Sequence, residues 1–323
     1  EDGFGVRSEE EEYRTADAAA REAASAIAAG TLPPFFGIRI RSLGGETRRR
    51  ALRTLDRFVR ALAQAAAGRM PPHFVVTLPK ITDPGQVAAL AEALEALEGS
   101  LGLPAGVLRL ELMIETPESI FDAEGRVAPP RLVAAARGRC VAAHFGTYDY
   151  TASLSITAAH QQMTHAACDF ARHVLQVSLA GSGIWLSDGA TNVLPVGGDT
   201  PSVHRGWKLH YDHVRHSLEH AYYQGWDLHP AQLPTRFAAV YAFFLEGFDA
   251  AAARLRNFVD RAARASVVGD VFDDAATGQG LLNYFLRAIN CGAVTEQEVA
   301  DRTGLSVDEL RTRSFGAILK RRG

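Results

Sequence analysis

The sequence has little cysteine and no excess of basic residues. Only three of its 323 residues are cysteines (Cys140, Cys168 and Cys291), and none belongs to a C-x-x-C pair. An odd number without paired spacing argues against a disulfide framework and indicates a reducing compartment. The formal net charge of −3 provides no basic stripe for DNA or RNA and no attraction to anionic membranes. We therefore expect neither nucleic acid nor a membrane as a partner.

Long hydrophobic runs are also missing. The longest clean apolar run, residues 237–245, has nine residues, whereas a membrane-spanning helix needs about 20. No basic segment followed by an apolar one opens the sequence, as a secretory signal would. Hydrophobic residues still make up 47% of the chain, which is enough for the core of one large domain. These features predict a soluble cytoplasmic protein.

What is present is an alternation of strand-like and helix-like segments. The strand-like runs are residues 36–40, 74–78, 107–114, 141–145 and 184–186, with a last one around 226–228. Segments of helical spacing lie between them, such as the one that begins at Asp83-Pro84, an N-cap followed by proline. This alternation predicts parallel βαβ units. Because a closed barrel needs eight units, about six predict an α/β fold of the TIM (β/α)8 type whose first one to two strands lie upstream of residue 1.

The remainder of the chain, after about residue 232, has a helical pattern. Two short amphipathic segments flank Gly304, in an arrangement similar to a helix-turn-helix. Since neither segment has a basic face, we interpret them as a packing appendage. We expect a barrel domain over residues 1–245 and a C-terminal helical extension over 246–323.

Charged residues follow the successive strand-like runs. They are Arg39, Lys80, Glu115, Asp149, Asp188 and His229. A polar residue at a strand end can simply meet water. Six in succession, with both signs of charge, favour a functional rim, because β/α barrels build their active sites at the carboxyl ends of the strands.

The residue types on this rim indicate metal and anion chemistry. Glu115 and Asp149 follow neighbouring strands, and two carboxylates without a thiolate or imidazole pair suit a hard cation. We predict Mg²⁺, with Mn²⁺ as the alternative. Arg39 can make a forked contact with a carboxylate or phosphate, and Lys80 adds a point charge. Gly146-Thr147 predicts a tight turn whose backbone N–H groups suit an anionic ligand.

Five short motifs occur in a fixed order along the chain. They are Gly37-Ile38-Arg39-Ile40, Leu78-Pro79-Lys80, Met113-Ile114-Glu115-Thr116-Pro117, Gly146-Thr147-Tyr148-Asp149 and His229-Pro230-Ala231-Gln232. This ordered set resembles the citrate lyase β-subunit and the related HpcH/HpaI aldolases, which are phosphoenolpyruvate/pyruvate-binding barrels. The resemblance runs from residue 1 to about 245 and fits an aldolase-like branch of that superfamily. Glu1-Asp2-Gly3 resembles the end of the family's second strand.

The resemblance implies a metal-dependent carbon–carbon lyase that acts on a 2-oxo acid or an acyl-CoA through a metal-stabilised enolate. It implies Mg²⁺ on Glu115 and Asp149, a coenzyme A thioester as candidate co-substrate, and a homo-oligomer. Arg39, on the substrate carboxylate, and Lys80 would be the catalytic residues. The predicted substrate-binding residues are Asp2, Gly146, Thr147 and Asp188. Asp2 and Asp188 are also the candidates for the general base.

Several alternatives stay open. A phosphotransferase that handles phosphoenolpyruvate or pyruvate would use the same barrel, and a non-catalytic ligand-binding barrel would retain only the fold. Tyr150 stands where the family usually has leucine, and residues 204–224 are unusual, so the substrate is undetermined. His216, Glu219 and His220 match the H-x-x-E-H zinc-protease pattern. Because no third ligand stands out downstream, we favour a solvent-facing or interface helix there.

Overall fold

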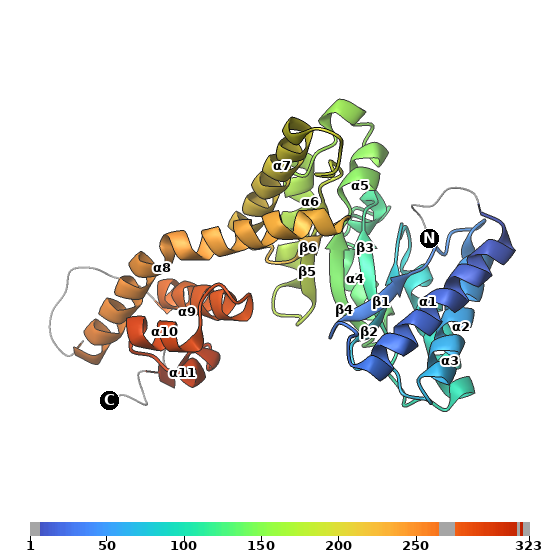
Figure 1. The fold of residues 1–323 in the computed structure, drawn as a ribbon, viewed down its shortest axis with the longest axis horizontal. Coiled ribbons are helices and arrows are strands. Elements are labelled where there is room, and N and C mark those ends of the chain that lie inside the picture. Colours follow the sequence, from blue (N-terminus) through green and yellow to red (C-terminus); the bar gives the residue numbers. More distant parts are fainter. Residues whose placement is uncertain (1–6, 265–274, 315–316, 319–323) are drawn as a thin grey trace. The chain divides into compact units, whose positions relative to one another are not determined.

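The computed structural model describes residues 7–264, 275–314 and 317–318. The chain forms two compact units, one of residues 1–190 with 224–226 and one of residues 191–223 with 227–323. The first unit holds one parallel sheet whose six strands lie side by side in sequence order (Figure 1). They are β1 (Phe36–Arg39), β2 (Phe74–Leu78), β3 (Arg109–Ile114), β4 (Cys140–Phe145), β5 (Trp185–Ala190) and β6 (Gly225–Trp226). The predicted α/β fold is therefore confirmed, as a parallel half-barrel of the TIM type.

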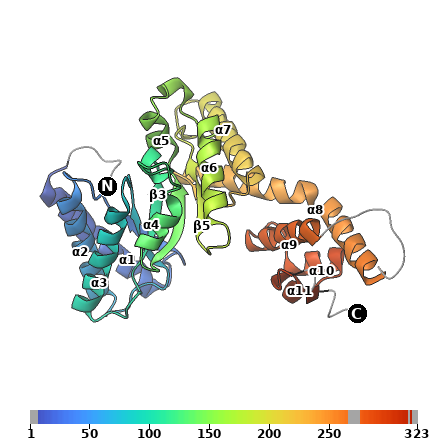
Figure 2. The ribbon, with the colours of Figure 1, turned by 180° about the vertical axis from the view of Figure 1, so that it is seen from behind.

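The connections of the first unit are helices, as the alternating pattern predicts. They are α1 (Glu9–Ala29), α2 (Arg48–Ala65), α3 (Pro84–Leu101), η1 (Pro117–Ser119), α4 (Pro129–Ala135), α5 (Thr147–Ser153), η2 (Ala158–His160) and α6 (Ala166–Leu179). Asp83 caps α3 by accepting a hydrogen bond from the backbone N–H of Gly85, and Pro84 occupies the first helical position. Contacts join α2 to α3, α3 to α4 and α4 to α6 (Figure 2).

The two faces of the sheet differ because side chains alternate along a strand. One face is apolar and packs with the helices in a single core, to which β3 contributes Leu110, Leu112 and Ile114, none of them measurably exposed. The intervening positions include polar residues, Glu111 on β3 and His144 on β4. The sheet therefore has an apolar outer face and an inner face that carries polar groups.

The apolar residues of α6 do not all face the core. Phe170 is 52% exposed. The buried row is instead Cys168, Ala171, Arg172, Leu175 and Leu179. Because the apolar residues of this helix cover more than half of its circumference, its periodicity alone does not select the buried row.

The second unit is helical. Its elements are α7 (Thr200–Glu219), η3 (Pro230–Gln232), α8 (Leu233–Arg264), α9 (Ala275–Asn290), α10 (Glu296–Thr303) and α11 (Val307–Arg311). Phe244 and Leu255 of α8 form a buried core with Leu282 of α9. Gly304 ends α10 in the left-handed conformation, which confirms the two short helical segments predicted around it. No helix in the described part of the chain is long and apolar enough to cross a membrane.

Candidate active site

Glu115 stands at the carboxyl end of β3 and is only 4% exposed. Its Oε1 accepts a hydrogen bond from the backbone N–H of Lys80 at 2.8 Å. The next residue, Thr116, caps η1 and donates its hydroxyl proton to the carbonyl of Ile81. These two bonds hold the segment after β3 against the segment after β2, which fixes the Glu115 carboxylate.

The electrostatic setting of Glu115 is that of a buried anion. Burial raises the pKa of the Glu115 carboxyl above its ordinary 4.5, and the negative charge of Asp149 raises it further. The Lys80 N–H bond and the positive charges of Lys80 and Arg39 act in the opposite direction without cancelling the rise in the pKa. A buried carboxylate in this state gains from a cation beside it.

Lys80 contacts both predicted metal-binding carboxylates. Its backbone has φ of 51°, a left-handed conformation that is uncommon outside glycine and concentrates at functional sites. This turn directs the N–H toward Glu115, while Nζ lies 2.7 Å from Oδ2 of Asp149. Asp149 belongs to the first turn of α5, and its side chain is 49% exposed. The two carboxylates are therefore joined through a single lysine.

Gly146 makes room for the Glu115 carboxylate. A Cβ atom at this position would lie 2.5 Å from both Cβ and Oε2 of Glu115, a distance at which atoms overlap. The backbone N–H of Gly146 donates to the carbonyl of Ile114 at 3.0 Å. The neighbouring Thr147 is 1% exposed, and its Oγ1 makes no hydrogen bond within the described residues. The glycine predicted as a ligand-binding turn thus also shapes the space around Glu115.

Arg39 is the last residue of β1. Its guanidinium carbon lies 5.3 Å from the centre of the Trp226 ring system, within the range of a cation–π contact. No hydrogen bond or ion pair joins Arg39 to another residue that the structure describes. A guanidinium carries five N–H donors in a fixed fork, and within the described residues none of those of Arg39 is used in a hydrogen bond while the group lies over the Trp226 ring system.

Asp188 has a partner inside the protein. β5 continues to Ala190, so Asp188 lies within the strand and not beyond its end, and it is fully buried. Arg172 of α6, also fully buried, donates from Nη1 to both carboxylate oxygens at 2.9 and 2.8 Å. The backbone N–H of Gly189 adds a third bond at 2.8 Å. Its predicted contact with substrate stays a prediction.

The two remaining residues of the sequence prediction are Asp2 and His229. Asp2 is outside the described residues. His229 belongs to the second unit, where its Nδ1 accepts the backbone N–H of Ala231 and so caps η3. This bond gives the His-Pro-x-Gln motif a local structural role.

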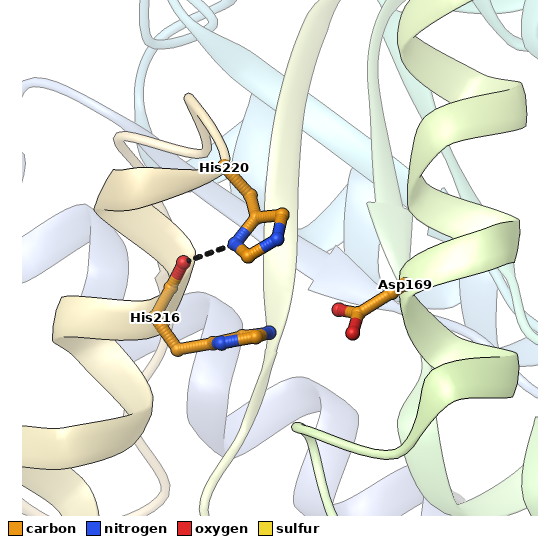
Figure 3. A group of neighbouring side chains, drawn as sticks. All are labelled: Asp169, His216 and His220. Carbon is orange, nitrogen blue, oxygen red and sulfur yellow. Dashed lines mark hydrogen bonds between the residues drawn. The ribbon is translucent and has the colours of Figure 1, made fainter.

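The H-x-x-E-H motif lies at the end of α7. The rings of His216 and His220 are 4.3 Å apart, and Nδ1 of His220 donates to the carbonyl of His216 at 2.8 Å (Figure 3). Glu219 between them is exposed. The third residue drawn in Figure 3, Asp169, belongs to α6 of the first unit, where it pairs with Arg172.

A row of polar side chains crosses the inner face of the sheet, and none of the five sequence motifs predicted it. It consists of Thr77, Glu111, His144, Ser187 and Trp226, one from each of β2 to β6, joined by hydrogen bonds. The sequence does carry a signal for this row. Glu111 and His144 are polar residues inside otherwise apolar strands, and alternate residues of a strand point to the same face of the sheet. This alternation places both side chains on the face away from the helices.

Comparison with solved structures finds the same fold. A citrate lyase from Burkholderia xenovorans LB400 matches with a TM-score of 0.63 and 20% identity, over 88% of this chain and 82% of that chain. A Haloferax volcanii malate synthase, in a ternary complex with pyruvate and acetyl-CoA, matches with a TM-score of 0.52 and 17% identity, over 95% and 84%. Its magnesium/glyoxylate complex matches with a TM-score of 0.52 and 16% identity, over 70% and 60%. The predicted resemblance to citrate-lyase-type HpcH/HpaI barrels is thereby confirmed at the level of the fold.

Sequence comparisons complete the assignment. None of the curated proteins compared with the chain matches it. The profile of one family, described as "Domain of unknown function (DUF6986)", matches residues 1–318. A match over nearly the whole chain decides membership, and the chain belongs to the DUF6986 family.

Proposed function

We propose that the chain is an aldolase-like enzyme, a Mg²⁺-dependent carbon–carbon lyase that acts on a 2-oxo acid or an acyl-CoA. One observation carries the proposal. At the carboxyl edge of a parallel half-barrel, Lys80 contacts both Glu115 and Asp149. The field of Arg39 reaches the same Glu115 carboxyl. β/α barrels carry out their chemistry at this edge of the sheet, and these residues place charges of both signs there.

The residues present fit a magnesium ion. Glu115 and Asp149 offer hard carboxylate oxygens, which Mg²⁺ prefers, and one or two such ligands are usual because the ion keeps water and substrate oxygens. The absent Cβ of Gly146 leaves space beside Oε2 of Glu115. The raised pKa of Glu115 marks a carboxyl that lacks full charge compensation. Lys80 would have to share Asp149 with the ion, since its Nζ now lies 2.7 Å away.

The chain's own residues have distinct roles in this proposal. Arg39 would bind the substrate carboxylate through its open donors. Glu115 and Asp149 would hold the ion, and Glu115 must be ionised to do so. Lys80 would keep the two carboxylates in register and add positive charge at the reacting end of the substrate. A bound Mg²⁺ supplies a Lewis acid that stabilises the enolate charge developed when a carbon–carbon bond breaks or forms.

The solved relatives support the substrate class. One malate synthase structure of the same fold holds magnesium and glyoxylate, and another holds pyruvate and acetyl-CoA. We therefore propose a 2-oxo acid as ligand and an acyl-CoA as the second reactant. The homo-oligomeric state, the cytoplasmic location and the division at residue 245 stay predictions.

Deuterium exchange at the methyl group of pyruvate tests the proposal. The full-length protein with Mg²⁺ in D₂O should exchange these protons, followed by NMR, because enolate formation labilises them. Glu115→Gln should lower the exchange rate about 100-fold. Glu118→Gln, an exposed carboxylate three residues away, is the matched control and should exchange like the wild type.

Two outcomes point elsewhere. If neither pyruvate nor oxaloacetate undergoes Mg²⁺-dependent exchange or cleavage, the lyase proposal is wrong and a non-catalytic barrel takes its place. Release of phosphate from phosphoenolpyruvate, without exchange, would instead indicate the phosphotransferase.

A further inference from the structure

The polar row on the inner face of the sheet has a defined direction of hydrogen bonding. The indole N–H of Trp226 points at Nδ1 of His144 at 3.2 Å. Because an indole nitrogen can only donate, Nδ1 must be the acceptor, and the ring carries its proton on Nε2. The Ser187 hydroxyl, bonded to the same Nδ1, is then a second donor to it.

The other end of the histidine is held by a carboxylate. Nε2 of His144 lies 2.9 Å from Oε2 of Glu111, and the Thr77 hydroxyl donates to the same oxygen at 3.2 Å. His144 is 7% exposed and Ser187 3% exposed. Buried polar groups that satisfy one another in this way are rigid, because each lost bond leaves a desolvated group.

The row ends under Arg39. The Trp226 ring packs on the His144 ring, with centroids 5.2 Å apart, and Arg39 lies over the Trp226 ring system. Arg39 makes no hydrogen bond or ion pair among the described residues, so its contact with this aromatic surface is what orients its side chain there. The orientation of the arginine therefore depends on the orientation of the indole, which the N–H bond to His144 fixes.

The geometry points to Trp226, His144 and Glu111 as positioning residues that hold Arg39 for a substrate carboxylate. This inference rests on the proposed function, in which Arg39 binds that carboxylate. Trp226 supplies the flat surface, His144 fixes its angle, and Glu111 holds the histidine tautomer whose Nδ1 accepts a hydrogen bond from the indole N–H. An arginine held over an aromatic ring keeps its N–H donors for the ligand, whereas an arginine held by a carboxylate uses some of them.

The first test needs no ligand. The chain has three tryptophans, and Trp226→Phe identifies the Trp226 indole N–H signal in an ¹H–¹⁵N spectrum by its loss. Arg39→Met and His144→Leu should each shift that signal. Arg57→Met, which removes an arginine from α2 that pairs with Asp17, should leave it in place. An unmoved signal in Arg39→Met overturns the inference.

The second test is the binding of pyruvate at saturating Mg²⁺, by calorimetry. Trp226→Leu should weaken pyruvate about tenfold, the effect of losing a desolvated cation–π support, while Mg²⁺ alone binds as to the wild type. Trp226→Phe keeps a ring but loses the N–H bond to His144, so its pyruvate affinity should fall between those of the wild type and Trp226→Leu. His144→Leu should weaken pyruvate, and His144→Asn, which keeps an acceptor near the Nδ1 position, should restore most of the affinity.

The two arms separate the inference from the function. If the wild type binds pyruvate and Trp226→Leu binds it equally well, only the positioning role is wrong. If Mg²⁺ binding falls together with pyruvate binding, the row is a general support of the fold and the positioning role is again wrong. If the wild type binds no oxo acid, the proposed function is wrong, and the role of Trp226 in substrate binding is wrong with it.

Discussion

Glu115 and Asp188 are two buried carboxylates near the carboxyl ends of strands, yet they have opposite surroundings. Glu115 is 4% exposed, and burial raises the pKa of its carboxyl. The positive charges of Lys80 and Arg39 act on it from nearby. Asp188 is fully buried and makes two hydrogen bonds to one guanidinium nitrogen of Arg172. Glu115 can therefore bind a cation, whereas the charge of Asp188 is already compensated by Arg172.

The difference arises because alternate residues of a strand point to opposite faces of the sheet. Glu115 continues the alternation of Glu111 and Met113, the inner-face positions of β3. Asp188 lies between Ser187 and Gly189, and so its side chain takes the opposite face, toward α6. A charged residue near a strand end therefore indicates a barrel site only when its parity matches the inner face.

The largest effect is expected from breaking the buried pair. Asp188→Asn removes the carboxylate charge that faces Nη1 of Arg172, while Asp169 still pairs with Nη2. It should lower the free energy of unfolding by about 3 kcal/mol. Urea denaturation followed by circular dichroism measures this. The double variant Asp188→Leu with Arg172→Met removes both charges and should lose less than the single variant. An unchanged stability with lost pyruvate binding would contradict the comparison and give Asp188 the substrate role.

A smaller effect is expected from filling the space beside Glu115. Gly146→Ala adds a Cβ that would lie 2.5 Å from Oε2 of Glu115, so the carboxylate must move. We expect Mg²⁺ affinity to fall about tenfold, which is the usual effect of changing the residues that position a metal ligand. Gly99→Ala is the control, because its Cβ would meet nothing within 4 Å on α3. It should leave Mg²⁺ affinity unchanged and add about 0.5–1 kcal/mol of stability.

The smallest effect concerns stability and pH in the metal-free protein. The folded-state pKa of Glu115 is raised above 4.5, so the folded state holds this proton more tightly than the unfolded state. The contribution of Glu115 to stability should therefore decrease as pH rises from 4.5 through the folded-state pKa, and the difference between the wild type and Glu115→Gln isolates this contribution. Glu115→Gln cannot ionise and should be more stable than the wild type at pH 7, by about 1 kcal/mol or less.

The same variant has a built-in reference at low pH. Well below pH 4.5 both side chains are uncharged in the folded and the unfolded state, and the two unfolding curves should coincide. A destabilised Glu115→Gln at pH 7 would mean that the carboxylate charge stabilises the fold, as that of Asp188 does, and the contrast between the two residues would be lost.

Much of the first unit could be predicted because its signals are local. The strand 74–78 ends where the apolar run ends, and the Asp83-Pro84 start of α3 is a cap that needs no tertiary contact. The ordered motifs also predicted the neighbourhood of Lys80, Glu115 and Asp149. Their order mattered more than any one motif, because each lies at the end of its own strand.

The remainder depends on contacts between distant residues. The partner of Asp188 is Arg172, which lies 16 positions earlier, among the polar residues of a helix whose apolar residues cover more than half of its circumference. The aromatic support of Arg39 comes from Trp226, at the far end of the sheet order. Neither pairing leaves a spacing in the sequence that periodicity could detect.

The most direct measurement is calorimetric titration of Mg²⁺ into the full-length protein, with and without pyruvate. The account predicts that the wild type binds Mg²⁺, that pyruvate tightens the binding, and that Glu115→Gln and Asp149→Asn each weaken it at least tenfold, while Glu118→Gln binds like the wild type. Equal binding by the wild type and both site variants, or no binding by the wild type even with pyruvate, would contradict a metal site at Glu115 and Asp149.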